Sequence, residues 1–209
     1  MVKLVIYASA ALLGAALMAF EMLVSRMLTP FFGGDLYNWA AVISVVLFAM
    51  MNGYFLGGAL VDRMPTLRWA SLFAAIAGLC FLTVELYAEP LFLYLLRTID
   101  DVQIGVLIAA FVVQIVPIAA LGAFSPIAIR IALRDVGEAG RVSGRIYAVS
   151  TTGNVVGVLG AVFFLIPRLG VTDSISLLAL ICFACAGALY LADMRLRGEA
   201  QEKTTEKTA

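Results

Sequence analysis

The chain has 209 residues, of which 63% are hydrophobic and 13% are charged, and its mean hydropathy is +1.04. Soluble domains average about 45–50% apolar and about 25% charged residues, so this composition predicts a polytopic membrane protein. Fourteen basic and fourteen acidic residues leave no net charge, and histidine is absent. These features argue against a nucleic-acid-binding surface, a metal site, a cofactor and an enzymatic activity.

Apolar stretches of about 20 residues are needed to cross a bilayer core about 30 Å thick. By this measure residues 1–194 form an all-α, polytopic bundle of six transmembrane helices. They are expected at 4–28, 36–60, 69–88, 104–124, 145–166 and 174–191. The stretch "EPLFLYLLRTIDD" is too short to span, and we expect an interfacial helix at 90–99 rather than a seventh span. Residues 195–209 are charged and are predicted to form a disordered tail.

Lysine and arginine are unevenly distributed between the two sides of the predicted bundle. Most of them fall on the side that carries both termini, in the 61–68 and 130–145 loops and after residue 194. Cytoplasmic loops close to membrane spans collect basic residues. We therefore expect both termini in the cytoplasm and the protein in the plasma membrane, which in a bacterium is the inner membrane.

The first predicted helix contains two ionisable side chains, in "AFEMLVSRML". A charge near the centre of a membrane helix costs about 2.5–3.5 kcal/mol on insertion scales. In one interpretation Arg26 extends outward to the headgroups and Glu21 sits high enough to be wetted. In the favoured one, Glu21 faces a water-filled cavity between helices, where it exchanges a proton or holds a cation, with Arg26 close to the site.

Uncharged polar residues occur near the middle of three other predicted spans. The candidates for substrate binding are Asn52, Gln114, Thr151 and Asn154. Each alone is more typical of a hydrogen bond between helices than of a binding site. Taken together they lie at the depth where transporters bind their substrates, so we expect them to orient a small polar solute.

Small residues four positions apart mark the second and fifth predicted helices. They are Gly53 and Gly57 in one helix and Gly153 and Gly157 in the other. Because helices in lipid associate through close backbone contact, these faces are expected to pack against another helix of the chain or against a second copy.

The loop after the second predicted helix reads "GGALVDRMPTLR". We expect Asp62 and Arg63, together with Arg145 at the start of the fifth helix, to tie the inner helix ends together and to gate that side. A solvated pair of loop charges is the alternative.

The same loop, in "GALVDR", resembles the G-x-L-x-D-R signature of major facilitator superfamily transporters, although Pro65 replaces the later glycine. Four longer stretches are similar to the membrane domain of the fused major facilitator/spermidine synthase family. They are "FEMLVSRMLTPFFG", "LYNWAAVISVVLFAMMNGYFLGGALVDR", "GAFSPIAIRIAL" and "GRVSGRIYAVSTTGNVVGVLGAVFFLIPRLG". The sequence contains neither a glycine-rich nucleotide loop nor an acidic aminopropyl-transfer motif.

This resemblance implies a transporter-like module built as one half of a twelve-helix transporter. We expect a small secondary transporter that works as a homodimer and moves a polyamine-like cation, coupled to protons through Glu21. The alternative is a non-transporting membrane subunit that anchors a separate, soluble aminopropyltransferase-like enzyme. A third is a scaffold in which every polar residue only satisfies a neighbour.

Overall fold

The computed structural model describes residues 2–133 and 135–208, with side chains up to residue 198. Every regular element in these residues is helical, which confirms the all-α prediction. The elements are α1 (Val2–Phe32), α2 (Leu36–Arg63), α3 (Arg68–Thr98), α4 (Val102–Ala132), η1 (Val136–Glu138), α5 (Ala139–Gly160), η2 (Ala161–Leu165) and α6 (Ile166–Thr208).

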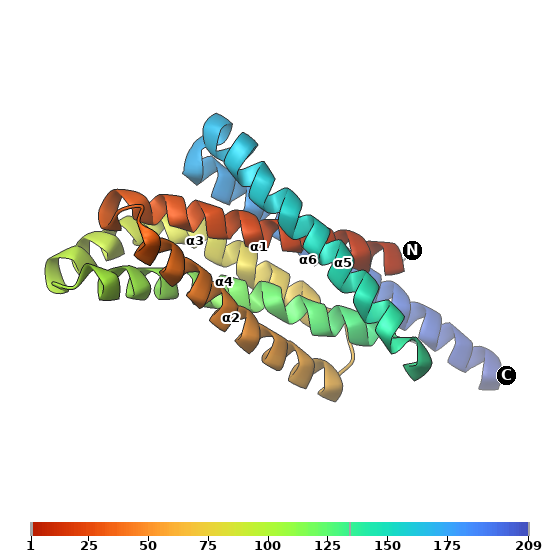
Figure 1. Ribbon diagram of the computed structural model, residues 1–209. Coiled ribbons are helices and arrows are strands. Elements are labelled where there is room, and N and C mark those ends of the chain that lie inside the picture. Colours follow the sequence, from red (N-terminus) through yellow and green to blue (C-terminus); the bar gives the residue numbers. More distant parts are fainter. Residues whose placement is uncertain (1, 134, 209) are drawn as a thin grey trace.

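Five helical stretches in the described residues are long and apolar enough to cross a membrane. Four are α1 to α4, and the fifth is the combined stretch Val136–Gly198. That fifth stretch is 63 residues long and has a break at Gly170, where φ is 77° and ψ is −174°. A φ in this range favours glycine, since it has no Cβ to clash with the backbone. At this point the chain turns back on itself, and both ends of the chain lie at the same end of the bundle (Figure 1).

Two short loops at the opposite end of the bundle are closed by aspartate caps. Asp35 accepts hydrogen bonds from the backbone nitrogens of Tyr37 and Asn38 at 3.1 and 3.2 Å. Asp101 does the same for Gln103 and Ile104, at 2.8 and 3.4 Å. Each cap satisfies donors that a helix start leaves unpaired, so α2 and α4 begin sharply after their turns.

The segment 90–99 is not a separate helix, because α3 continues through Pro90 to Thr98. Phe92 is 1% exposed, and its ring centroid lies 5.3 Å from that of Phe31 and 6.0 Å from that of Phe32. Pro90 removes one backbone hydrogen-bond donor from α3. The packing of Phe92 against α1 stabilises the part of the helix that follows the proline. The expected disordered tail lies largely outside the described side chains, and the backbone of α6 is helical to Thr208.

Glycine brings two pairs of helices into backbone contact. A Cβ on Gly53 or Gly57 of α2 would lie 2.2 or 2.4 Å from a carbonyl oxygen of α4. A Cβ on Gly153 or Gly157 of α5 would lie 2.0 or 2.2 Å from a carbonyl oxygen of α1. These glycine faces are therefore occupied within the chain, in the pairs α2–α4 and α1–α5. Contacts between the two pairs are sparser: α1 and α4 meet over part of their length, and α1–α2 and α4–α5 contact each other least.

Candidate functional site

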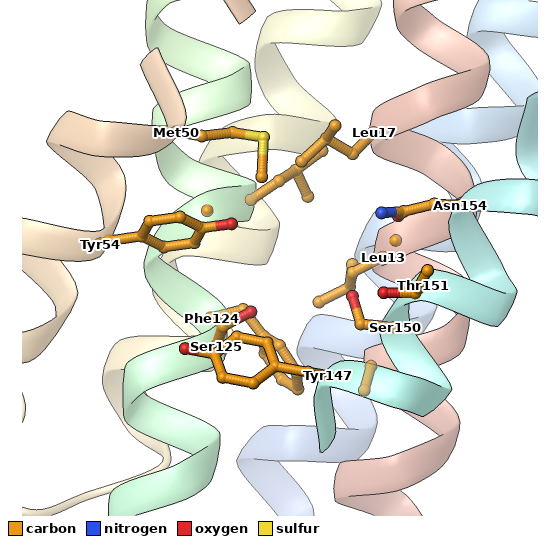
Figure 2. Close-up of a pocket in the computed structure, with 14 residues that line it drawn as sticks. Leu13, Leu17, Met50, Tyr54, Phe124, Ser125, Tyr147, Ser150, Thr151 and Asn154 are labelled. Atoms are coloured by element: carbon orange, nitrogen blue, oxygen red, sulfur yellow. The ribbon is translucent and has the colours of Figure 1, made fainter. Parts of the chain in front are cut away.

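A polar pocket lies in the seam between the two helix pairs (Figure 2). Its volume is about 70 Å³, enough for a few water molecules or one small cation. The polar side chains that line it are Tyr54, Ser125, Tyr147, Ser150, Thr151 and Asn154. The structure thus brings the predicted residues Thr151 and Asn154 together in one polar pocket.

Asn154 is held at the wall of the pocket by two backbone carbonyls. Its amide nitrogen donates to the carbonyl of Ser150 at 3.2 Å and to that of Gly14 at 2.9 Å, an orientation assigned by these two acceptors. A side chain on Gly14 would clash, since a Cβ there would lie 2.6 Å from the Ser150 oxygen. Asn154 therefore joins α5 to α1, and its amide oxygen remains as an acceptor in the pocket.

Two tyrosines stand on opposite walls of the pocket and leave it partly open to the outside of the chain. Tyr54 reaches across from α2, and Tyr147 lies on α5 together with Thr151 (Figure 2). Tyr54 is 39% exposed and Tyr147 is 50% exposed. The seam is thus unsealed along the face formed by α2 and α5.

Sequence reasoning missed Tyr54, Ser125 and Tyr147 as members of the site. On α5 a recognisable signal was present, because Tyr147, Ser150, Thr151 and Asn154 follow the i, i+3, i+4, i+7 spacing of one helix face. Tyr54 and Ser125 are single polar residues on apolar helices, and only the packing of α2 and α4 reveals them.

Glu21 is buried on α1, with 6% of its surface exposed. It lies four residues after Leu17 and seven after Gly14, both of which line the pocket, so it occupies the same helix face about 10 Å beyond Gly14. Within the described part of the chain, its carboxyl group makes no hydrogen bond and no ion pair. Glu21 is therefore a buried acid on the pocket-facing side of α1, beyond the lining of the pocket and without a partner among the described residues.

Gln114 is completely buried on α4, and neither its amide nitrogen nor its amide oxygen has a partner among the described residues. It lies seven residues before Leu121 and eleven before Ser125, on the pocket-facing side of α4. Native proteins pair most buried polar atoms, so two unpaired atoms on one side chain need an explanation.

Glu21 and Gln114 lie at similar depths in the bundle. The antiparallel helices α1 and α4 meet where a Cβ on Gly105 would be 3.1 Å from the ring of Phe32. Glu21 is eleven residues before Phe32, and Gln114 is nine residues after Gly105, a difference of about 3 Å along the axes. The faces of α1 and α4 that line the pocket thus continue along the bundle to Glu21 and Gln114. We call the pocket, Glu21 and Gln114 together the polar column.

The π-helical turn η2 lies beside the upper part of the polar column. Helices α5 and α1 run parallel, with Gly157 against Ala15. Ala161, the first residue of η2, is one turn further on and is fully buried, so the π turn lies near the depth of Glu21. A π turn interrupts the regular hydrogen-bond ladder, and such turns are frequent at functional sites.

Asn52 and Arg26 lie outside the polar column. Asn52 donates to the carbonyl of Phe48 on its own helix at 2.8 Å and borders an apolar groove between α2, α3 and α4. Arg26 is exposed and lines a separate hollow with Glu85 and Glu89. The expectation that Asn52 and Arg26 share a site with Glu21 is therefore not met, because each faces a different neighbour around its helix.

Among the described residues, no ion pair joins the three residues expected to gate one end of the bundle. Asp62 lies 4.0 Å from Arg130, and 75% of its side chain is exposed. Arg63 and Arg145 are exposed, and no ion pair of either is present in the described part of the structure. At this end Asp62 and Arg130 form a loose surface pair, which contributes little to stability.

A buried aspartate that sequence reasoning missed ties this end of the bundle together. Asp193 of α6 is 3% exposed and accepts hydrogen bonds from Thr66 Oγ1 at 2.7 Å and from the backbone nitrogen of Leu67 at 3.0 Å. It also accepts from Arg68 Nε at 3.1 Å and from Arg197 Nε at 2.7 Å. A signal was present, since Asp193 is the only acidic residue between positions 174 and 198.

No protein-family model matches the sequence, and neither a curated protein nor a solved structure matches the chain. The interpretation of the polar column therefore depends on its own geometry. That geometry is a pocket lined by polar side chains, with a buried acid and a buried amide on the same helix faces beyond it, in a bundle of apolar helices long enough to cross a membrane.

Proposed function

We propose that the chain is a transporter module that binds a small polar or cationic solute, or the proton that drives it, in the polar column. The observation that carries this proposal is Gln114 on the pocket-facing side of α4, whose two amide atoms are fully buried and have no partner among the described residues. An unsatisfied buried polar group costs about 1–3 kcal/mol. This cost is offset in a state of the protein where water or a solute reaches the amide.

Glu21 supplies the ionisable group. Glu21 is buried and has no partner among the described residues, so its charged form is costly, and it is proposed to hold a proton while no water or cation reaches it. When the column fills with water, the same group releases the proton or binds a cation. The amide of Gln114 and the carbonyl oxygen of the Asn154 amide provide neutral ligands along the route.

The proposed module crosses the membrane six times. The fifth apolar stretch is broken at Gly170, and its two limbs, α5 and α6, are proposed to cross separately, which leaves both termini on one side. The seam along α2 and α5 is open, with Tyr54 and Tyr147 at its edge. A second copy of the chain is proposed to close this seam and to enlarge the pocket, which alone is too small for a whole metabolite.

The substrate class is proposed from the carboxyl group and from the family resemblance. An ammonium group fits a pocket of about 70 Å³ lined by hydroxyl and amide oxygens. The similarity to the membrane domain of the fused transporter/spermidine synthase family suggests a polyamine. Putrescine and spermidine are therefore the first probes.

The test is uptake of radiolabelled putrescine and spermidine into liposomes that contain the purified protein, with and without an imposed pH gradient. Glu21→Gln should abolish the pH-dependent part of uptake, whereas Glu89→Gln, an exposed acid on α3, should leave uptake unchanged. Equal pH-dependent uptake by the wild type and by Glu21→Gln would contradict the assigned role. No uptake at all, with a soluble enzyme co-purifying in stoichiometric amount, would favour the anchoring subunit instead.

A further inference from the structure

A further hollow lies between α3 and α6 at the end of the bundle that carries both termini (Figure 1). Its volume is about 600 Å³, and it shares no lining residue with the polar pocket. Its polar wall is formed by Thr66, Arg68, Tyr190 and Arg197, and its apolar wall includes Leu72 and Ala75 on the next turns of α3. The function proposed above makes no use of this hollow.

The two arginines of this hollow are oriented by the buried Asp193. Arg68 and Arg197 each donate from Nε to Asp193 Oδ2, at 3.1 and 2.7 Å. One terminal nitrogen of Arg197 also donates to Thr66 Oγ1 at 3.0 Å. Both terminal nitrogens of Arg68 and the other terminal nitrogen of Arg197 make no hydrogen bond within the described residues. Side chains of both arginines are about half exposed, at 48% and 51%.

The charges of these three residues do not balance. Two guanidinium groups face one carboxylate, so the cluster carries one surplus positive charge and several free N–H donors that already have a fixed direction. Arg68 is further held over the ring of Tyr190, with its guanidinium carbon 5.8 Å from the ring centroid. The side chains are thus fixed before any ligand arrives, which lowers the entropic cost of binding an anion.

The position of the hollow limits the kind of anion that would fit it. It lies where apolar membrane-length helices end, and Trp69 and Tyr190 at its edge are residue types that collect at the membrane–water interface. From the arginines the hollow continues along Leu72 and Ala75, toward the apolar middle of α3. A ligand that matches both parts has a phosphate group at one end and a hydrocarbon chain at the other.

We propose that this hollow binds an anionic phospholipid, with the headgroup phosphate on Arg68 and Arg197 and an acyl chain along Leu72 and Ala75. A lipid of net charge −1, such as phosphatidylglycerol, neutralises the surplus charge of the cluster. Phosphatidylcholine carries a compensating positive charge and does not. The bound lipid would stabilise the contact between α3 and α6 and the loop that precedes α3.

The test is lipid binding by the whole protein, purified in detergent and freed of lipid. Native mass spectrometry counts bound lipids, and thermal unfolding is followed during titration with phosphatidylglycerol or phosphatidylcholine. The wild type should bind one phosphatidylglycerol in preference to phosphatidylcholine, and its Tm should rise. Arg68→Gln combined with Arg197→Gln should weaken phosphatidylglycerol binding by about tenfold or more.

The matched control is Arg97→Gln combined with Arg168→Gln, which removes the same charge at the opposite end of α3 and α6 and should keep full binding. Because Arg68→Gln and Arg197→Gln each also remove a partner of Asp193, Leu72→Trp is the second variant. It fills the apolar part of the hollow without altering a charge, and it should also abolish selective binding. Equal binding of the two lipids would overturn the proposal, as would unchanged binding by Leu72→Trp. Displacement of the lipid by glycerol 1-phosphate at equal concentration would also overturn it, because that result would assign the site to a free phosphate.

Discussion

Gly153 of α5 packs directly on the backbone of Ala11 in α1, so closely that a Cβ on Gly153 would lie 2.0 Å from the Ala11 carbonyl oxygen. The same helix carries Gly144, around which a Cβ would meet nothing within 4 Å. Alanine substitutions at Gly153 and Gly144 therefore measure how much the close packing of α5 on α1 contributes to stability, with both variants in the same helix.

Gly153→Ala should destabilise the protein, because α5 must move away from α1 to admit the methyl group. Overpacking of this kind costs about 1–3 kcal/mol. Gly144→Ala should instead be neutral or stabilising by up to about 1 kcal/mol, since alanine favours the helix. Thermal unfolding of both variants in the same detergent checks the difference in sign. A Gly153→Ala protein as stable as Gly144→Ala would contradict the close contact.

Asp193→Asn should lower the free energy of unfolding by about 1.5–3 kcal/mol, the range for hydrogen bonds that involve charged groups. The amide that replaces the carboxylate leaves Arg68 and Arg197 without a counter-charge. Asp62→Asn is the control, because its pair with Arg130 is exposed and 4.0 Å long. That control should change stability by less than about 1 kcal/mol. Similar losses in both variants would contradict the assignment of Asp193 as the tie at this end.

Gln114→Leu separates a binding role from a structural one. If the amide serves a solute, its removal should leave the protein as stable as the wild type or more stable by about 1–3 kcal/mol, because no hydrogen bond is lost. Uptake into liposomes should nevertheless fall. Gln103→Leu, at an exposed position near the start of α4, should affect neither quantity. A large loss of stability in Gln114→Leu would show that the amide holds helices together.

Water in the seam can be detected with thiol reagents after the three native cysteines are replaced. Thr151→Cys lines the polar pocket and should react with a charged methanethiosulfonate reagent in liposomes. Val156 is 60% exposed but lies outside the pocket, on the other side of α5. Val156→Cys should therefore react much more slowly than Thr151→Cys. Equal rates at the two positions would mean that the seam is no more hydrated than the lipid-facing surface.

Asn52 and Asn154 show which part of the site was predictable. Both are amides near the middle of apolar segments, and both were reasonable candidates by depth alone. Depth follows from counting residues along a helix, whereas direction depends on how each helix is rotated in the bundle. Asn154 faces α1 and the pocket, and Asn52 bonds to its own helix beside an apolar groove.

Asp62 and Asp193 show the same limit at the end of the bundle. The motif around Asp62 is easily seen in the sequence, yet its side chain is exposed and loosely paired. Asp193 stands in no motif, and its partners Thr66, Leu67 and Arg68 are more than 120 residues away in the chain. A contact at that separation is created only when α6 packs against α3.

The sequence by itself determined that this is an all-helical protein with helices long and apolar enough for a membrane, because composition and the length of apolar runs are local properties. It also marked Glu21 and the glycine faces, since a charge or a missing side chain stands out in an apolar helix. Only the tertiary structure decided which polar groups meet. Close contacts at the glycines pack α1 against α5 and α2 against α4. The polar column lies in the seam between these two pairs.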